Sequence, residues 1–143
     1  MAEQNYQNHT QRPTGFLALA LVMFVCFIGA GVNLYQSLGD HQRIYSASLI
    51  LVLIVCVFFT AGYARTFALK AQDRAIRAEE NFRHYVLTGK PLDSRLSIRQ
   101  IIALRFAPDA EFPDLAQRAA GGSLSPDDIK RAVKNWRPDT YRV

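Results

Sequence analysis

The fold is decided by residues 15–64, which read GFLALALVMFVCFIGAGVNLYQSLGDHQRIYSASLILVLIVCVFFTAGYA. Two apolar runs in this stretch, 16–38 and 44–64, contain no Asp, Glu, Lys, Arg or His. A bilayer core about 30 Å thick is crossed by roughly 20 apolar residues in a helix, and both runs are long enough. Only the five residues 39–43 separate the runs, so the stretch predicts two antiparallel membrane-spanning helices.

The charges of the chain lie almost entirely on one side of this stretch. Of its 17 Lys and Arg residues, 15 follow Ala64, and the net charge of the 143 residues is +5. Cytoplasmic flanks of membrane helices are enriched in Lys and Arg, and this bias sets their orientation. We therefore expect an inner-membrane protein with both termini in the cytoplasm and with four residues at the membrane surface: Arg65, Lys70, Arg74 and Arg77.

Residues 1–14 form a short polar tail, and neither apolar run suggests chemistry. The tail is either a simple leader to the membrane or an ordered docking segment with Tyr6 and His9 as contacts. Cys26 and Cys56 lie within the two runs, where thiols act mainly as small hydrophobic groups.

Residues 65–88 contain neither Gly nor Pro, and this predicts that the second membrane helix continues as a cytoplasmic stalk. The pairs Asp73–Arg77 and Glu79–Arg83 have the i,i+4 spacing that supports a helix. At 100° per residue one face of this stalk collects Ala and aromatic residues. We name this face the stalk stripe, and it requires a cover, either the C-terminal helices or another subunit; it comprises Phe67, Ala68, Ala71, Ala75, Ala78, Phe82, Tyr85 and Val86.

Residues 89–143 predict a small cytoplasmic domain of three short helices. Ser97 and Gln100 form a capping-box pattern at the start of the first helix. The second helix is expected over about 109–120, with an inner face of Phe112, Leu115, Ala116 and Ala119. The third is expected to begin at Ser125 and Pro126 and to end at Pro138, with an inner face of Ile129, Ala132, Val133 and Trp136. The predicted fold is therefore all-α.

The sequence shows no pattern of catalytic, cofactor-binding or metal-ligating residues. The three histidines fall in three different regions. Five carboxylates lie at predicted helix starts, where the helix dipole stabilises a negative charge, and this role is favoured over a catalytic one. They are Asp109, Glu111, Asp114, Asp127 and Asp128. We expect no enzyme activity, no cofactor, no nucleic acid and no small-molecule substrate. Trp136 is either a core anchor or, with Arg137 and Tyr141, part of a contact patch.

Several stretches resemble a family of small bacterial two-span membrane proteins of unknown function. They are RIYSAS (43–48), ARTFALKAQDRAIR (64–77) with Glu79-Glu80, IALRFA (102–107), KNWRPD (134–139), and Gln4-Asn5-Tyr6 with Asn8-His9. The resemblance implies a bacterial source. It also implies that the stalk and the last helix are contact surfaces. Some members of that family carry a permease-type label.

The leading hypothesis is a non-enzymatic scaffold or accessory subunit that acts through its cytoplasmic helices. Its expected partners are the lipid bilayer and either another protein or further copies of the same chain. The expected contact residues are Phe67, Ala71, Ala78, Phe82, Tyr85, Trp136, Arg137 and Tyr141. One alternative is a small component of a membrane transport system. Another is a lipid- or nucleic-acid-binding enzyme, which requires a clustered polar pocket in the soluble part.

Overall fold

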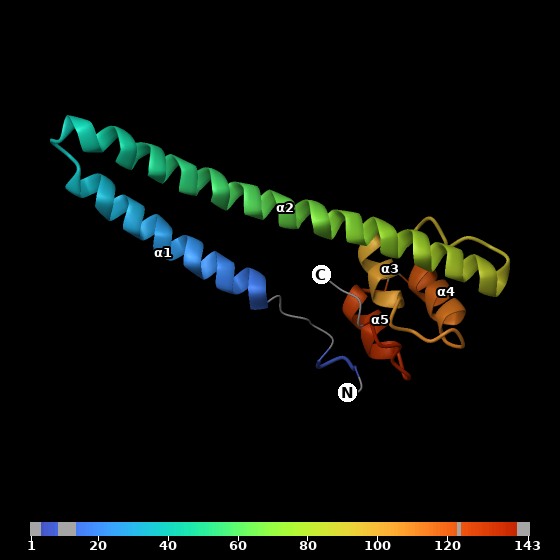
Figure 1. The fold of residues 1–143 in the computed structure, drawn as a ribbon. Coiled ribbons are helices and arrows are strands. Elements are labelled where there is room, and N and C mark those ends of the chain that lie inside the picture. The colour runs from blue at the N-terminus through green and yellow to red at the C-terminus, as the bar shows by residue number, and fades with distance from the viewer. Residues whose placement is uncertain (1–3, 9–13, 123, 140–143) are drawn as a thin grey trace. The chain divides into compact units, whose positions relative to one another are not determined.

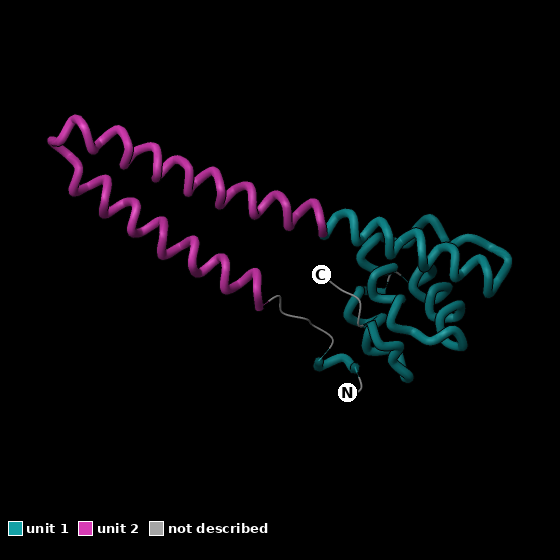
Figure 2. Tube along the Cα trace, in the orientation of Figure 1, with its two compact units in different colours: residues 1–11, 69–143 teal, residues 12–68 magenta. Residues whose placement is uncertain are grey.

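The computed structural model describes residues 4–8, 14–122 and 124–139. This part of the chain contains five α-helices and no strand, so the all-α prediction is confirmed for it (Figure 1). The helices are α1 (Thr14–Gln36), α2 (His41–Thr88), α3 (Ile98–Leu104), α4 (Phe112–Gly122) and α5 (Pro126–Ala132). The chain forms two compact units, one of residues 12–68 and one of residues 69–143 together with the N-terminal residues 1–11 (Figure 2).

In the unit of residues 12–68, α1 and the first part of α2 form an antiparallel helix pair joined by a tight elbow (Figure 1). Gly39 adopts a φ of +99°, a conformation that glycine reaches without a steric penalty. The Asp40 carboxylate accepts the Gln42 N–H at 2.9 Å and so caps α2. This cap starts α2 at His41, three residues before the apolar run that the sequence predicted as the span.

Both helices of this pair are long and apolar enough to cross a membrane, by length and composition. In the most apolar stretch of 18 residues in each helix, only 11% is buried in α1 and 6% in α2. The buried residues among the described part of this unit are small and lie near the elbow: Ala30, Ser37 and Ala47. The large apolar side chains are therefore exposed along both helices, for example Phe24 (56%), Val25 (60%), Leu53 (63%) and Phe59 (59%).

In the other unit, α2 ends at Thr88 because the next residue takes a left-handed conformation. Gly89 has a φ of +71°, and its N–H donates to the Tyr85 carbonyl at 2.8 Å. The chain then turns back along α2, where the Asn81 side-chain oxygen accepts the Leu92 N–H at 2.9 Å. This contact begins the return of residues 92–96 towards the helical core.

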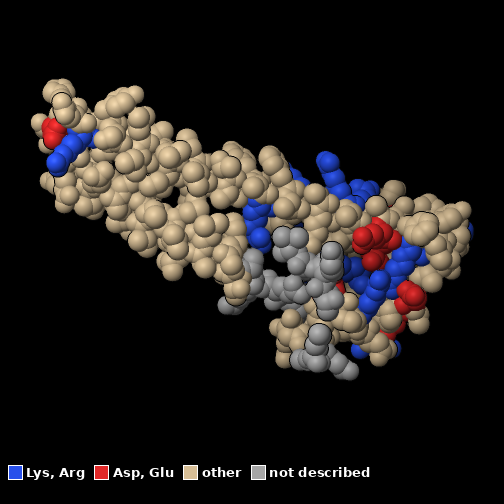
Figure 3. All heavy atoms as spheres, in the orientation of Figure 1, with Lys and Arg blue, Asp and Glu red and all other residues tan. Residues whose placement is uncertain are grey.

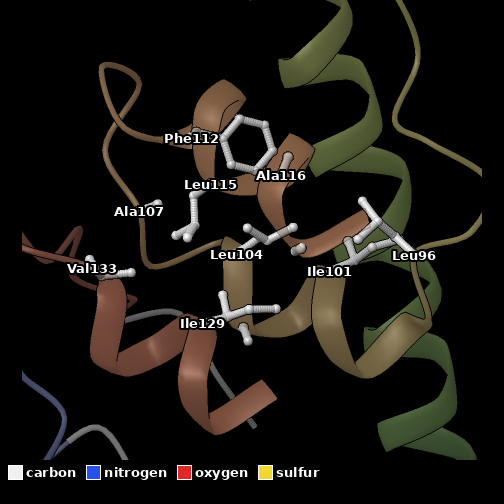
Figure 4. Close-up of a cluster of buried hydrophobic side chains, with 11 residues drawn as sticks. Leu96, Ile101, Leu104, Ala107, Phe112, Leu115, Ala116, Ile129 and Val133 are labelled. Carbon is white, nitrogen blue, oxygen red and sulfur yellow. The ribbon is translucent and has the colours of Figure 1, made fainter. Parts of the chain in front are cut away.

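The three short helices α3, α4 and α5 enclose one hydrophobic core (Figure 4). The capping box predicted at Ser97 and Gln100 is present at the start of α3, and Ser125 caps α5. The predicted inner face of the second short helix is also confirmed, since Phe112, Leu115, Ala116 and Ala119 are all buried in α4. We call residues 92–139, which contain α3, α4 and α5, the core unit. Its largest fully buried side chains are Phe106, Phe112, Leu104 and Ile129.

Helix α5 is shorter than its apolar spacing predicts. It ends at Ala132, and Val133 is extended, with φ −70° and ψ 120°. The Glu111 carboxylate accepts the next two backbone N–H groups, from Lys134 at 3.0 Å and Asn135 at 3.2 Å. These bonds replace the helical hydrogen bonds that would have continued α5. The expected helical position of Trp136 was therefore wrong, and this residue lies in a segment without regular secondary structure.

Candidate functional site

Three segments that are distant in sequence meet beside the second half of α2. They are the turn of α2 around Glu80, the loop after α3 and the irregular segment 134–139. Arg83 donates to Glu80 Oε2 at 2.9 Å, to Asp109 Oδ1 at 2.7 Å and to the Ala107 carbonyl at 2.7 Å. We call these connected residues the arginine cluster; its charged members are Glu80, Arg83, Asp109 and Arg137.

The centre of the arginine cluster is buried. The Glu80 side chain is 7% exposed and that of Arg83 is 13% exposed. The Arg83 guanidinium also lies over the Phe112 ring, 4.4 Å from its centroid. Arg83 therefore pairs with Glu80 and Asp109, and not with Glu79 as the i,i+4 spacing predicted. Because both charges are buried, removal of either one alone leaves the other without its main partner and destabilises the fold.

A hollow of about 620 Å³ opens over the arginine cluster. Arg137, half exposed, reaches its rim and lies 3.8 Å from Glu80 Oε1. The hollow has the polar character that the enzymatic alternative requires; its lining residues are Glu79, Glu80, Arg83, Pro108, Asp109 and Arg137. Its carboxylates and guanidinium groups can hold a charged group of a partner.

The segment 134–139 is fixed to the core by contacts on both sides of its tryptophan. Trp136 packs on Phe106 with a ring-centroid distance of 4.8 Å, and the Arg137 N–H donates to the Phe106 carbonyl at 2.8 Å. Arg105 stacks over the same Phe106 ring at 4.5 Å and pairs with Asp139 at 2.9 Å. Trp136 is half buried against the core, while Arg137 keeps its guanidinium partly exposed.

Glu111 holds the start of this segment through three hydrogen bonds. Besides the two backbone bonds, its carboxylate accepts the Asn135 side-chain amide at 2.9 Å. The backbone N–H of Lys134, followed by the Asn135 contacts, lowers the pKa of Glu111 below its ordinary value of 4.5. This carboxylate was predicted as a helix-start charge; in the structure it links α4 to the C-terminal segment.

Replacing Glu111 with Gln is expected to loosen residues 134–136. The amide keeps only part of the acceptor capacity, and amide hydrogen exchange of these residues should become about fivefold faster, the effect of losing roughly 1 kcal/mol of hydrogen bonding. Because the folded pKa lies below the ordinary one, the contribution is complete above pH 4.5 and is lost as the pH falls through the folded value. Exchange measured from pH 7 to pH 3 should show this loss in the native chain and not in Glu111→Gln.

The N-terminal tail contacts the same C-terminal region. The Gln4 side-chain oxygen accepts the Asp139 N–H at 2.6 Å, and Arg131 donates to the Tyr6 hydroxyl at 3.3 Å. The Arg131 guanidinium lies 5.3 Å from the centroid of the Tyr6 ring, and the Tyr6 hydroxyl raises the pKa of Arg131. Tyr6, one of the two contacts predicted for a docking tail, thus contacts Arg131 of the same chain, and the docking role itself stays a prediction. The other predicted contact, His9, lies outside the described residues.

The four basic residues expected at the membrane surface are accessible to different degrees. Arg65 is half buried, with its guanidinium 4.8 Å from the centroid of the Phe16 ring. Lys70, Arg74 and Arg77 are exposed. In Figure 3 the surface of the helix pair of residues 12–68 is mostly neutral, with charged atoms at its elbow, and the unit of residues 69–143 carries many charged side chains.

The stalk stripe is exposed, and the C-terminal helices do not cover it. Phe67 is 62% exposed, Phe82 68% and Tyr85 55%, and Ala71 and Ala78 are exposed as well. The opposite face of α2 packs against the core unit instead, where Ile76 and Glu80 are buried. On that face the His84 ring contacts the Phe112 ring at 5.8 Å. The contact residues predicted on the stalk are thus accessible. Of the others, Trp136 and Arg137 border the core and the hollow, and Tyr141 lies outside the described residues.

Inspection of the sequence missed the arginine cluster and the Glu111 contacts. Their residues come from separate segments, and no spacing rule joins Arg83 to Asp109 or Glu111 to Asn135. One signal was present: Glu80, Arg105 and Asp139 all lie within stretches that carry the family resemblance. The structure brings those stretches together.

Comparisons with known proteins identify one family and no characterised relative. A family model described as "Family of unknown function (DUF6526)" matches residues 1–143. No curated protein and no solved structure matches the chain.

Proposed function

Because this chain belongs over its whole length to the DUF6526 family of unknown function, its role has to be argued from its own structure, and we propose that it is a two-span inner-membrane protein that acts as a scaffold or accessory subunit. In this proposal α1 and the first part of α2 cross the bilayer. Residues 69–143 and the N-terminal tail form a cytoplasmic unit that binds partners and has no enzyme activity. The resemblance to small bacterial membrane proteins supports a bacterial membrane as the location.

The observation that carries the proposal is the exposure of large apolar side chains along two long helices. A core helix of a soluble protein buries such side chains, whereas only 6% of the most apolar window of α2 is buried here. Side chains such as Leu53 and Phe59 have a favourable environment only in lipid or against another protein. Each span carries no charged residue, so insertion incurs no charge-burial penalty.

The contacts of the N-terminal tail support the same topology. Gln4 and Tyr6, which precede α1, bind Asp139 and Arg131, which follow α2. A chain that crosses the membrane twice brings its two ends to the same side. The excess of Lys and Arg after Ala64 supports the cytoplasm as that side.

Topology is tested with single cysteines in a variant in which Cys26 and Cys56 are replaced by Ala. An impermeant maleimide applied to intact cells should label Gln42→Cys, in the first turn of α2 next to the elbow, and should label Lys90→Cys only after the cells are lysed. Both positions are exposed, so the comparison depends on sidedness and not on burial. Labelling of Lys90→Cys in intact cells, or recovery of the protein in the soluble fraction, would refute the proposal.

The accessory role is tested by purification from the native membrane in mild detergent. A partner present at fixed stoichiometry supports the proposal when Arg137→Glu, on the rim of the hollow, lowers its recovery at least fivefold. Arg118→Glu, an exposed arginine outside the hollow, is the matched control and should retain the partner. A homo-oligomer without partners that conducts a solute in vesicles would instead favour the transport alternative.

A further inference from the structure

The exposed face of α2 within residues 69–88 has the residue spacing of a coiled coil. Ala71, Ala75, Ala78, Phe82 and Tyr85 follow one another at intervals of four, three, four and three residues. This alternation places them at successive d and a positions of a heptad repeat, with Ala75 and Phe82 at a. All five are exposed, including Phe82 at 68% and Tyr85 at 55%. We call these five residues the seam.

We propose that the seam is a homodimer interface, in which the α2 helices of two copies of this chain pack in parallel. The inference rests on the membrane insertion proposed above, because two copies inserted with the same topology present their α2 helices in the same direction. The remaining steps use residues 69–88 alone.

The opposite face of α2 is already occupied, so the seam is the side of the helix left for a partner. Ile76 and Glu80 are buried, and Arg83 and His84 contact residues of the core unit. At 100° per residue, Ala71, Ala78 and Phe82 project within about 20° of the direction opposite to Glu80. A second helix can therefore approach the seam from the side of α2 that lies away from Ile76 and Glu80.

The charges beside the seam fit a parallel pair. Arg74 occupies a g position and Glu79 the next e position, which are the positions that face each other across a parallel two-stranded coil. A symmetric dimer therefore forms two Arg74–Glu79 pairs between the helices. Neither residue is in an ion pair in the described part of one chain, while the neighbouring Glu80 and Arg83 are paired with each other.

The size of the seam side chains also fits a second copy. Alanine at three successive positions allows two helix backbones to approach closely, at the lower end of the usual 8–10 Å interaxial distance. Phe82 and Tyr85 then add aromatic area at the end of the seam. A partner with large side chains along its whole length would not fit the alanine part.

Disulfide cross-linking of the full chain in native membranes tests the interface. In the background without Cys26 and Cys56, mild oxidation should join Ala71→Cys and Ala78→Cys into covalent dimers. Arg77→Cys is the matched control, because it is exposed and adjacent in sequence but lies outside the seam. We expect at least tenfold more dimer for Ala78→Cys than for Arg77→Cys.

A charge exchange tests the direction and register of the pair. Arg74→Glu should lower the dimer yield of Ala78→Cys about threefold, and Arg74→Glu combined with Glu79→Arg should restore it. No cross-linking at either seam position, or equal cross-linking at Ala78→Cys and Arg77→Cys, would overturn the interface. If maleimide labelling supports the proposed topology but no cross-linking occurs, the dimer is refuted and the membrane role stands, with a different partner or lipid covering the seam. If maleimide labelling contradicts the topology, the proposed membrane role is refuted.

Discussion

Replacing Phe112 with Ala should destabilise the core of residues 69–143 by about 3–5 kcal/mol. Phe112 is completely buried at the start of α4 and is one of the largest buried side chains. Its ring also contacts His84 at 5.8 Å and lies under the Arg83 guanidinium at 4.4 Å. Removal of the ring therefore leaves a cavity and weakens the attachment of α2 to the core.

Hydrogen exchange of the detergent-solubilised full chain measures this loss. Amides of α3, α4 and α5 should exchange at least a hundredfold faster in Phe112→Ala. The matched control is Phe59→Ala, which removes the same side chain from a position outside the core and the seam that is 59% exposed. That variant should keep native protection in these helices, within about 0.5 kcal/mol. Equal protection in both variants would show that Phe112 does not support the core.

The second large effect is expected at Arg83. In Arg83→Met, Glu80 keeps a carboxylate that is 7% exposed, and its remaining charged neighbour is Arg137 at 3.8 Å. Asp109 and the Ala107 carbonyl lose their donor as well. Breaking a buried ion pair from one side costs roughly 3–5 kcal/mol, because one charge stays buried without compensation.

The double variant Glu80→Gln with Arg83→Met separates burial of a charge from loss of packing. With both charges removed, at least half of the lost stability should return, measured as protection of the α2 and α4 amides. Arg95→Met is the matched control, because Arg95 pairs with Asp93 on the exposed loop and its loss should not change protection. A double variant as unstable as the single one would contradict the charge argument and point to packing alone.

Much of the fold follows from local patterns in the sequence. The uncharged runs predicted two long apolar helices; α2 contains the second run, and α1 contains the first run up to Gln36, two residues short of its predicted end. Ser97 with Gln100 and Ser125 with Pro126 predicted two helix starts that the structure shows. Each of these features depends on residues within one or two helical turns. Short-range hydrogen bonds and side-chain periodicity are sufficient to specify them.

The candidate site was less predictable, because its residues belong to separate segments. Arg83 was expected to pair with Glu79, four residues before it. The structure pairs it with Glu80 and with Asp109, which the loop after α3 brings within 2.7 Å. Likewise, the apolar spacing predicted that the last helix continues to Pro138. In the structure the N–H groups of Lys134 and Asn135 donate to the Glu111 carboxylate and do not take part in α5.

Local sequence was sufficient to locate the apolar surface, the helix starts and the cationic residues, because each is a property of neighbouring residues. The buried face of α2 could not be located in this way. The amphipathic pattern along 65–88 was equally consistent with the stalk stripe facing the C-terminal helices, so long-range packing had to select the face. Packing selected the opposite face: Ile76 enters the core unit, and Glu80 obtains Arg83 as a buried partner. Phe82 and Tyr85 were thereby left exposed, because a helix side can be covered only by segments that the whole chain brings to it.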